Sequence, residues 1–229
     1  MTMPAAPIVT IDGPSGSGKG TISRAIARHA EWHLLDSGAL YRLVALAGLR
    51  AGLAPDDEAG HARLAATMDA VFGVGPHGAE QVILDGLEVT GAIRSEEAGQ
   101  GASRVAAWPG VRAALMERQR AFARPPGLVA DGRDMGTVVF PHADLKIFLT
   151  ASPAERALRR YKQLKDKGSD VSLAALSREI AERDLRDSTR AVAPLKPASD
   201  AEVIDSTGLS IEAVVGRVLE LGARRSLWA

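Results

Sequence analysis

The sequence predicts an α/β domain in which helices cover both faces of a central parallel β-sheet. Apolar runs alternate with segments of helical periodicity along the 229 residues, and the runs are apolar throughout, as in strands buried on both sides. Several of these runs end in glycine, aspartate or other turn-forming residues. Because ligands of such sheets bind at the carboxyl ends of the strands, a site is expected in the loops that follow them.

The chain opens with an expected strand, a glycine-rich loop and a helix. Residues 8–11 form a β-branched run that stops at Asp12-Gly13-Pro14, where glycine and proline favour a turn. Residues 21–30 then repeat their apolar side chains at helical spacing. Further strands are expected at 34–35, 128–130, 145–149 and 203–204. Further helices are expected at 39–51, 55–70, 95–107, 109–123, 153–167, 173–188 and 210–223.

A different pattern at residues 71–89 predicts a small antiparallel insertion. Two short strand-like runs, 82–84 and 87–89, flank the pair Asp85-Gly86. Such a pair is typical of a type I′ hairpin turn, in which both central residues take positive φ. A β-hairpin is therefore expected inside an otherwise helical stretch.

The composition excludes several classes of protein. Hydrophobic residues make up 46% and charged residues 24%, as in ordinary globular proteins, and no apolar run approaches the roughly 20 residues of a membrane span. The absence of cysteine excludes disulfides, zinc thiolate sites and thiol catalysis. A net charge of zero lacks the basic excess of a nucleic-acid binder. Without a secretory signal at the N-terminus, we expect a cytoplasmic protein that binds neither membrane nor nucleic acid.

Residues 13–21 match the phosphate-loop pattern G-x-x-x-x-G-K with one departure. The glycines let backbone N–H groups turn toward an anion, the following helix presents its positive end, and Lys19 reaches the β- and γ-phosphates of a nucleotide. Gly20 stands where the strict pattern has the Ser or Thr whose hydroxyl binds Mg²⁺, and the hydroxyl of Thr21 comes one residue later. The sequence therefore does not decide which protein groups would bind Mg²⁺. The nucleotide-binding residues expected here are Gly13, Pro14, Ser15, Gly16, Ser17, Gly18, Lys19, Gly20 and Thr21.

Three segments interleave acidic residues with arginines, at 36–42, 131–137 and 183–190. Phosphoryl transfer between two nucleotides brings two polyanions together and needs cations on both sides of the transferred group. Segment 131–137 places glycines around an Arg-Asp pair after an apolar strand, which favours a site. Segment 183–190, taken alone, fits a solvated helix face better.

Four motifs, in the same order and over nearly the whole chain, resemble those of bacterial cytidylate kinases, which are phosphate-loop kinases of nucleoside monophosphates. They are I-D-G-P-S-G-x-G-K-G-T at 11–21, L-L-D-S-G at 34–38, A-D-G-R-D-M-G-T-V-V-F-P at 130–141 and R-D-x-R-D-x-x-R-A-V-A-P-L at 183–195. The resemblance implies a P-loop kinase that moves the γ-phosphate of ATP to CMP or dCMP with Mg²⁺ as cofactor. We expect it to act as a monomer.

The resemblance also implies roles for individual residues. The CMP phosphate would be held by Ser37, Arg42, Arg133 and Arg190. Cytosine would be read by Ser103, Arg112 and Asp134, and the ribose would meet Arg183 and Asp187. The lid over ATP would be flanked by basic helices that carry Arg156, Arg159 and Arg160. The residues expected to act in catalysis are Lys19, Arg133, Arg183 and Arg190.

In this interpretation, residues 1–229 form a single kinase domain with two subdomains. Its core would comprise 7–54, 125–152 and 191–225. The monophosphate-binding subdomain would span about 55–124, with the β-rich insertion at about 71–89, and the helical lid would span about 153–190.

Two other functions remain open from the sequence. One is a kinase of the same fold that acts on UMP, AMP or a non-nucleotide acceptor. The other is a non-enzymatic module, a nucleotide switch or RNA-binding protein that uses the loop only to sense ATP. In the kinase interpretation no general base is needed, because the second pKa of a monophosphate is about 6 and the attacking oxygen is already ionised at neutral pH.

Overall fold

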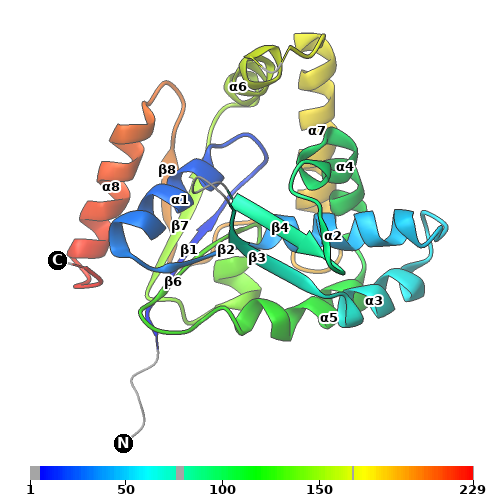
Figure 1. Ribbon diagram of the computed structural model, residues 1–229. Coiled ribbons are helices and arrows are strands. Elements are labelled where there is room, and N and C mark those ends of the chain that lie inside the picture. The colour runs from blue at the N-terminus through cyan, green and yellow to red at the C-terminus, as the bar shows by residue number, and fades with distance from the viewer. Residues whose placement is uncertain (1–5, 76–79, 167, 229) are drawn as a thin grey trace, which may run out of the picture. The chain divides into compact units, whose positions relative to one another are not determined.

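The computed structural model describes residues 6–75, 80–166 and 168–228, and the chain forms two compact units (Figure 1). The first unit consists of Met1–Asp36 and Gln119–Ala229, and the second of Ser37–Arg118. Residues 76–79 of the expected insertion, and Lys167, where the helix at 153–167 was expected to end, lie outside the described residues.

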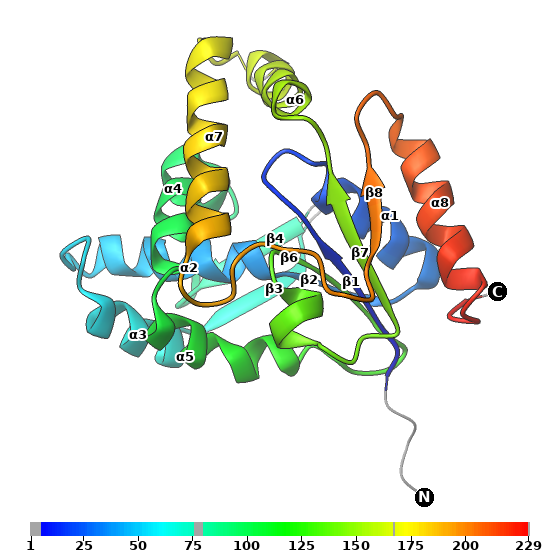
Figure 2. The ribbon, with the colours of Figure 1, turned by 180° about the vertical axis from the view of Figure 1, so that it is seen from behind.

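The first unit is built on a parallel sheet, which confirms the predicted α/β class. Its strand order is β2-β6-β1-β7-β8, and each neighbouring pair runs parallel (Figure 2). The strands are β1 (Ile8–Asp12), β2 (His33–Asp36), β6 (Leu128–Gly132), β7 (Leu145–Thr150) and β8 (Glu202–Asp205). The helices of this unit are α1 (Lys19–Ala30), α6 (Pro153–Asp166), α7 (Leu173–Thr189) and α8 (Ile211–Ala223).

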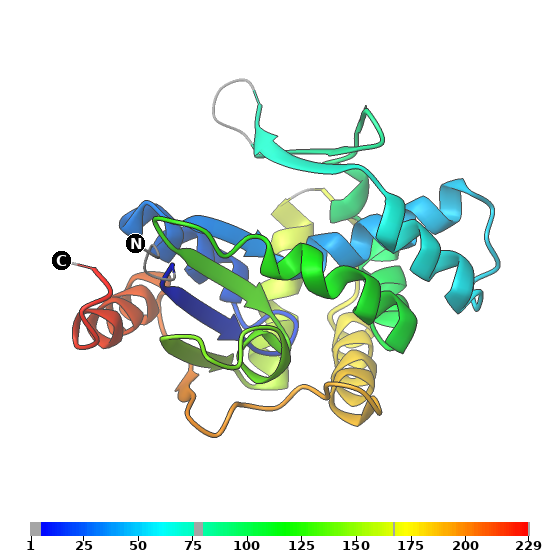
Figure 3. The same cartoon turned by 90° about the horizontal axis from the view of Figure 1, so that it is seen from below.

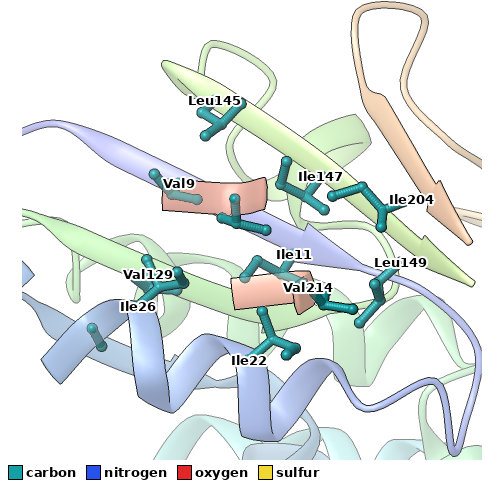
Figure 4. Packing of buried hydrophobic residues seen from close by; sticks show 12 residues of the cluster. Val9, Ile11, Ile22, Ile26, Val129, Leu145, Ile147, Leu149, Ile204 and Val214 are labelled. Atoms are coloured by element: carbon teal, nitrogen blue, oxygen red, sulfur yellow. The ribbon is translucent and has the colours of Figure 1, made fainter. Parts of the chain in front are cut away.

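Successive side chains of β1 point to opposite faces of the sheet. Val9 and Ile11 are fully buried and point toward α1 and α8, where Ile22 and Val214 meet them (Figure 4). Because successive strand residues face opposite sides, Asp12 points the other way, toward the turn that follows β6. One short strand thus contributes both to the apolar core and to the polar edge where β1 ends.

The second unit combines helices with a three-stranded antiparallel sheet (Figure 3). Its helices are α2 (Ser37–Arg50), α3 (Glu58–Thr67), α4 (Glu96–Val105) and α5 (Pro109–Arg120), the last of which runs into the first unit. Its strands are β3 (Ala70–Val74), β4 (Glu80–Leu84) and β5 (Leu87–Glu88). Helices α2 and α4 pack closely, since a Cβ added at Gly101 would lie 2.9 Å from the Cβ of Ala45.

The hairpin predicted at Asp85-Gly86 is confirmed. Asp85 has φ 49° and Gly86 has φ 79°, as a type I′ turn requires, and Leu84 pairs with Leu87 across the two-residue loop. The amide of Asp69 also donates to the Asp85 carboxylate at 2.9 Å, which ties the turn to the start of β3.

The expected helices are present, with ends that differ from the predicted ones for local reasons. α3 begins at Glu58 rather than at residue 55 because Asp57 caps it, its carboxylate accepting from the amide of Gly60 at 2.8 Å. Pro109 is the first residue of α5, as expected of proline. Two short elements were not predicted, a 3₁₀ turn at Ala92–Arg94 and a π-helical turn, η3, at Met135–Val139.

Among the described residues, every helix is too short or too polar to cross a membrane.

The turn geometry makes a prediction about stability. Gly86→Ala adds a Cβ that meets no neighbour but must adopt left-handed φ, so it should destabilise the protein by about 1–2 kcal/mol. Gly91→Ala is the matched control in the same unit, since it is equally open and has φ −65°. Urea unfolding of both variants should lower the midpoint for Gly86→Ala alone. Equal midpoints would contradict the assigned turn.

Candidate functional site

The loop between β1 and α1 has the backbone that its glycines predict. Gly13, Gly16 and Gly18 all have positive φ, at 155°, 77° and 94°. A Cβ at Gly13 would lie 2.0 Å from the carbonyl oxygen of Leu149, so only glycine fits against β7 there. The loop leads directly into Lys19 at the start of α1, which brings the helix N-terminus and its unsatisfied N–H groups to the site.

Lys19 is buried among charges of both signs. Its Nζ donates to the carbonyl oxygen of Pro14 at 3.2 Å. Burial, followed by repulsion from Arg133 and Arg183, lowers the pKa of Lys19 from 10.5 to about 7, although Asp131 and Asp36 oppose the shift. An added polyanion would restore the charge of the lysine, so this cluster is suited to phosphate.

Carboxylates from neighbouring strand ends supply the opposing charge. Asp36 pairs in register with Asp131 at the ends of β2 and β6, which puts both at the carboxyl edge of the sheet. Burial, and to a smaller degree Asp36, raises the pKa of Asp131, whereas Lys19 and Arg133 lower it, and the net result is a pKa of about 6. The register of the sheet therefore places acids from distant parts of the sequence beside the phosphate-loop lysine.

Asp12 holds the segment that follows β6. Its two carboxylate oxygens accept from the amides of Met135 and Gly136, each at 2.8 Å. Burial raises the pKa of Asp12 to about 7, against the effect of these two hydrogen bonds. From the local sequence, Asp12 is expected only as part of a turn. Its role as the residue that fixes η3 depends on a contact across more than 120 residues, which no local pattern reveals.

Arg133 and Asp187 form an ion pair in the first unit. The Nε of Arg133 donates to Asp187 Oδ2 at 2.9 Å, and its NH1 donates to the carbonyl of Gly132 at 3.4 Å. Burial alone would raise the pKa of Asp187, but Arg133, together with Arg183 and Arg190, brings it below the usual range. This pair joins the end of β6 to α7, so segments 131–137 and 183–190 meet in one place.

Asp134 and Arg190 meet at the same place. The two groups approach to 3.6 Å, and both side chains are almost fully buried. Arg190 is the C-cap of α7 and also donates from Nε to the carbonyl of Ala193. The structure thus groups Arg133, Asp134, Asp187 and Arg190, four of the expected site residues, and brings Lys19 near Arg133 and Arg183.

Two basic residues of α6 contact the phosphate loop itself. Arg156 donates to the carbonyl of Ser15 at 3.1 Å, and Arg159 donates to the carbonyl of Ser17 at 3.3 Å. Arg159 also binds Ser206, a buried serine after β8 that sequence analysis missed. Arg160 follows on the same helix. Both guanidinium groups that touch the loop therefore bind protein carbonyls in this structure.

The remaining expected site residues belong to the second unit. Ser37 opens α2, and Arg42 on the same helix donates to the carbonyl of Ile93 at 3.3 Å. Ser103 lies on α4 and is buried. Arg112, on α5, is also buried and donates to the hydroxyl of Tyr41 at 3.3 Å. Arg42 and Arg112 therefore each have a hydrogen-bond partner within their own unit.

One carboxylate lies beside the phosphate loop where a metal ion could be held. Among the described residues no group of three His, Asp or Glu side chains could hold a metal ion by itself. At Gly20, where the strict loop pattern has a hydroxyl, an added Cβ would lie 3.2 Å from Asp131 Oδ2. The Asp131 carboxylate is thus the protein oxygen beside that position, and carboxylate is a ligand type that Mg²⁺ prefers.

Comparison with known proteins assigns the chain to a family. A family model described as Cytidylate kinase matches residues 9–224. The chain belongs to the cytidylate kinase family. A curated cytidylate kinase of Pseudomonas aeruginosa is 60% identical over 217 residues, which cover 94% of each chain. One of Nitrosococcus oceani is 58% identical over 214 residues, which cover 93% of this chain and 94% of that relative.

One solved structure that aligns with the chain has a much lower sequence identity. A shikimate kinase from Acinetobacter baumannii aligns over 97% of this chain and 96% of its own, with 15% identity and a TM-score of 0.47. A likeness that weak supports no further conclusion. The family assignment rests on the sequence relatives and the family model, and it confirms the resemblance that the four motifs carry.

The lowered pKa of Lys19 predicts that nucleotide binding takes up protons. At about pH 8.5 the lysine with a pKa of about 7 is mostly neutral, and bound phosphates should raise its pKa, so up to about one proton should enter with ATP. Titration calorimetry in two buffers of different ionisation enthalpy measures this uptake. Lys19→Arg is the control, because arginine stays charged and should take up none. Equal uptake by wild type and variant would contradict the assignment.

Proposed function

We propose that this chain transfers the γ-phosphoryl group of ATP to CMP and dCMP, giving ADP and the diphosphate. The observation that carries the proposal is a phosphate loop whose lysine has its charge suppressed beside two arginines. Such a cluster is suited to the two polyanions that phosphoryl transfer brings together. Membership of the cytidylate kinase family supports CMP as the acceptor of the phosphoryl group.

In the proposed mechanism the protein positions the two nucleotides and neutralises their phosphate charge, and no side chain acts as a base. Lys19 would neutralise the β- and γ-oxygens of ATP from one side. Arg133 and Arg190, with Ser37 and Arg42, would hold the acceptor phosphate, and Arg133, Arg183 and Arg190 would help neutralise the transferred group. The attacking oxygen of CMP is already ionised at neutral pH, so the reaction needs only alignment and charge stabilisation.

Three residues would recognise the base, and two would contact the sugar. We assign cytosine to Asp134, Ser103 and Arg112, following the family resemblance. The ribose would meet Asp187 and Arg183. For Asp134, burial supports the assignment, since a desolvated carboxylate discriminates strongly between a donor and an acceptor.

We further propose that Mg²⁺ accompanies ATP, held by phosphate oxygens and water with Asp131 nearby. The metal, when bound, would neutralise charge on the β- and γ-phosphates. Asp131 is the side chain beside the loop position that usually supplies a hydroxyl. The loop residues Gly13 to Thr21 would cradle the phosphates through their N–H groups. Cytoplasmic location and a monomeric state stay predictions.

Base preference and transfer are tested together by ADP release across CMP, dCMP, UMP and AMP. A kinase for UMP or AMP would show a different preference. An ATP-sensing module, which the family assignment does not favour, would release ADP at a rate independent of CMP. We expect CMP and dCMP to stimulate release the most.

Lys19→Met should abolish CMP-dependent transfer and leave the fold intact. The thioether cannot neutralise the β- and γ-oxygens, and loss of such a contact costs transition-state stabilisation. The rate of ADP formation and the far-ultraviolet circular dichroism spectrum measure the two properties. Near-wild-type turnover with an unchanged spectrum would rule out the role given to Lys19.

Asp134→Ala should narrow the preference for CMP over UMP. Cytosine presents an exocyclic amino donor where uracil presents a carbonyl oxygen, so a buried carboxylate favours cytosine. Its removal should reduce the ratio of kcat/KM values by about tenfold or more. Asp134→Asn should shift preference the same way, because its amide can donate to uracil. A ratio that stays constant in two active variants would mean that Asp134 does not read the base.

A further inference from the structure

Arg156 makes four hydrogen bonds within the first unit, although the family resemblance places it on a lid over ATP. It stands in the first turn of α6, and its side chain is 4% exposed. Its Nε donates to the carbonyl of Ala151 at 2.9 Å, and NH1 donates to the carbonyl of Ser15 at 3.1 Å. NH1 and NH2 also bind the two oxygens of Asp184, at 3.0 and 2.5 Å. Four of the five N–H donors of the guanidinium group thus point to protein groups.

The groups that Arg156 joins serve different nucleotides. Ser15 belongs to the phosphate loop, and the fit there is close, since a Cβ added at Gly16 would lie 3.0 Å from the Cβ of Arg156. Asp184 belongs to α7, where it directly follows Arg183. One planar guanidinium group therefore links the loop for the donor phosphates to the helix that carries residues assigned to the acceptor.

Helix α7 is fixed at two points on one side. Asp184 binds Arg156, and Asp187, three residues further on, binds Arg133 at 2.9 Å. Residues three apart lie on the same helix face, so a rotation or shift of α7 would disturb both ion pairs. The position of α7 is consequently tied to the phosphate loop through one pair and to the end of β6 through the other.

We propose that Arg156 and Asp184 are a positioning pair that makes the binding of ATP and of the acceptor cooperative. ATP in the phosphate loop would fix the positions of the Ser15 carbonyl and of Arg156. Through its bond to Asp184, Arg156 would then stabilise α7 in the position where that helix contacts CMP. Neither member of the pair touches the reacting atoms. The proposal rests on the proposed function for the identity of the two ligands, and it gives Asp184 a role where the resemblance gives none.

Cooperativity separates this role from a merely structural one. A buried ion pair that only stabilised the fold would change unfolding or both affinities, whereas a coupling pair changes how one ligand affects the other. By linkage, the factor by which a non-hydrolysable ATP analogue tightens CMP must equal the factor by which CMP tightens the analogue. Measuring both factors gives an internal check.

The experiment measures the Kd of CMP by calorimetry, with and without saturating ATP analogue. In the wild type we expect the analogue to tighten CMP by about fivefold or more. In Asp184→Asn we expect CMP alone to bind within about twofold of wild type and the coupling factor to fall close to one. Because the coupling is reciprocal, the Kd of the ATP analogue at saturating CMP should rise by the same factor, while its Kd without CMP stays near the wild-type value. Asp184→Glu, which keeps the carboxylate, should recover part of the coupling.

Two further variants complete the test. Arg156→Lys replaces the planar guanidinium with a point charge that cannot bind Ser15 and Asp184 together, so this variant should also lose the coupling. It replaces Asp184→Asn in the experiment if that variant does not fold. The double variant should lose no more than either single one. Asp170→Asn is the matched control, since it breaks an exposed pair, 3.2 Å apart, between Lys165 at the end of α6 and Asp170 in the loop that leads to α7. Its coupling factor should equal that of the wild type.

Two results would overturn the proposal. One is a coupling factor in Asp184→Asn and Arg156→Lys equal to that of the wild type. The other is a wild-type protein that phosphorylates CMP yet binds the two ligands independently. A wild type that binds ATP but releases no ADP with CMP would instead refute the proposed function.

Discussion

Cationic side chains that repel one another are held together at the phosphate loop, and the acids of neighbouring strand ends and of α7 hold several of them there. Lys19 lies near Arg133 and Arg183, and its pKa is lowered as a result of burial and this repulsion. The acids do not cancel the cations completely. Asp187 more than offsets the effect of burial on Arg133, so the pKa of Arg133 is raised. Asp131, whose own pKa is raised to about 6, opposes the lowering of the Lys19 pKa only in part. The site thereby keeps an unmet preference for negative charge.

The geometry of β1 shows how so short a segment can serve two purposes. Because side chains alternate, Val9 and Ile11 enter the apolar core while Asp12 faces η3 and accepts from two of its amides. Asp134 immediately precedes those amides, so the strand that leads into the phosphate loop also fixes the residue assigned to the base. A shift in register by one residue would lose both contacts at once.

Features that depend on local backbone preferences are predictable from this sequence, whereas features that depend on strand register and long-range contacts are not. The glycine-rich loop and the Asp85-Gly86 turn were predicted because positive φ has a strong residue preference. The pairing of Asp36 with Asp131, and of Arg156 with Asp184, depends on which strands and helices become neighbours. The placing of Ser103 and Arg112 in a site came only from resemblance, since both read as ordinary helix residues.

The acids beside the arginines orient them more than they neutralise them. In Arg133 the Nε is bound to Asp187 and NH1 to a backbone carbonyl, while NH2 has no hydrogen-bond partner among the described residues. The planar group is therefore fixed at one end and has donors left at the other. In the proposed function, an acceptor phosphate bound there would need no rearrangement of the guanidinium, because a preorganised cation stabilises developing charge at less cost than a mobile one. The same logic explains why arginine, with its fork of donors, suits these positions better than lysine.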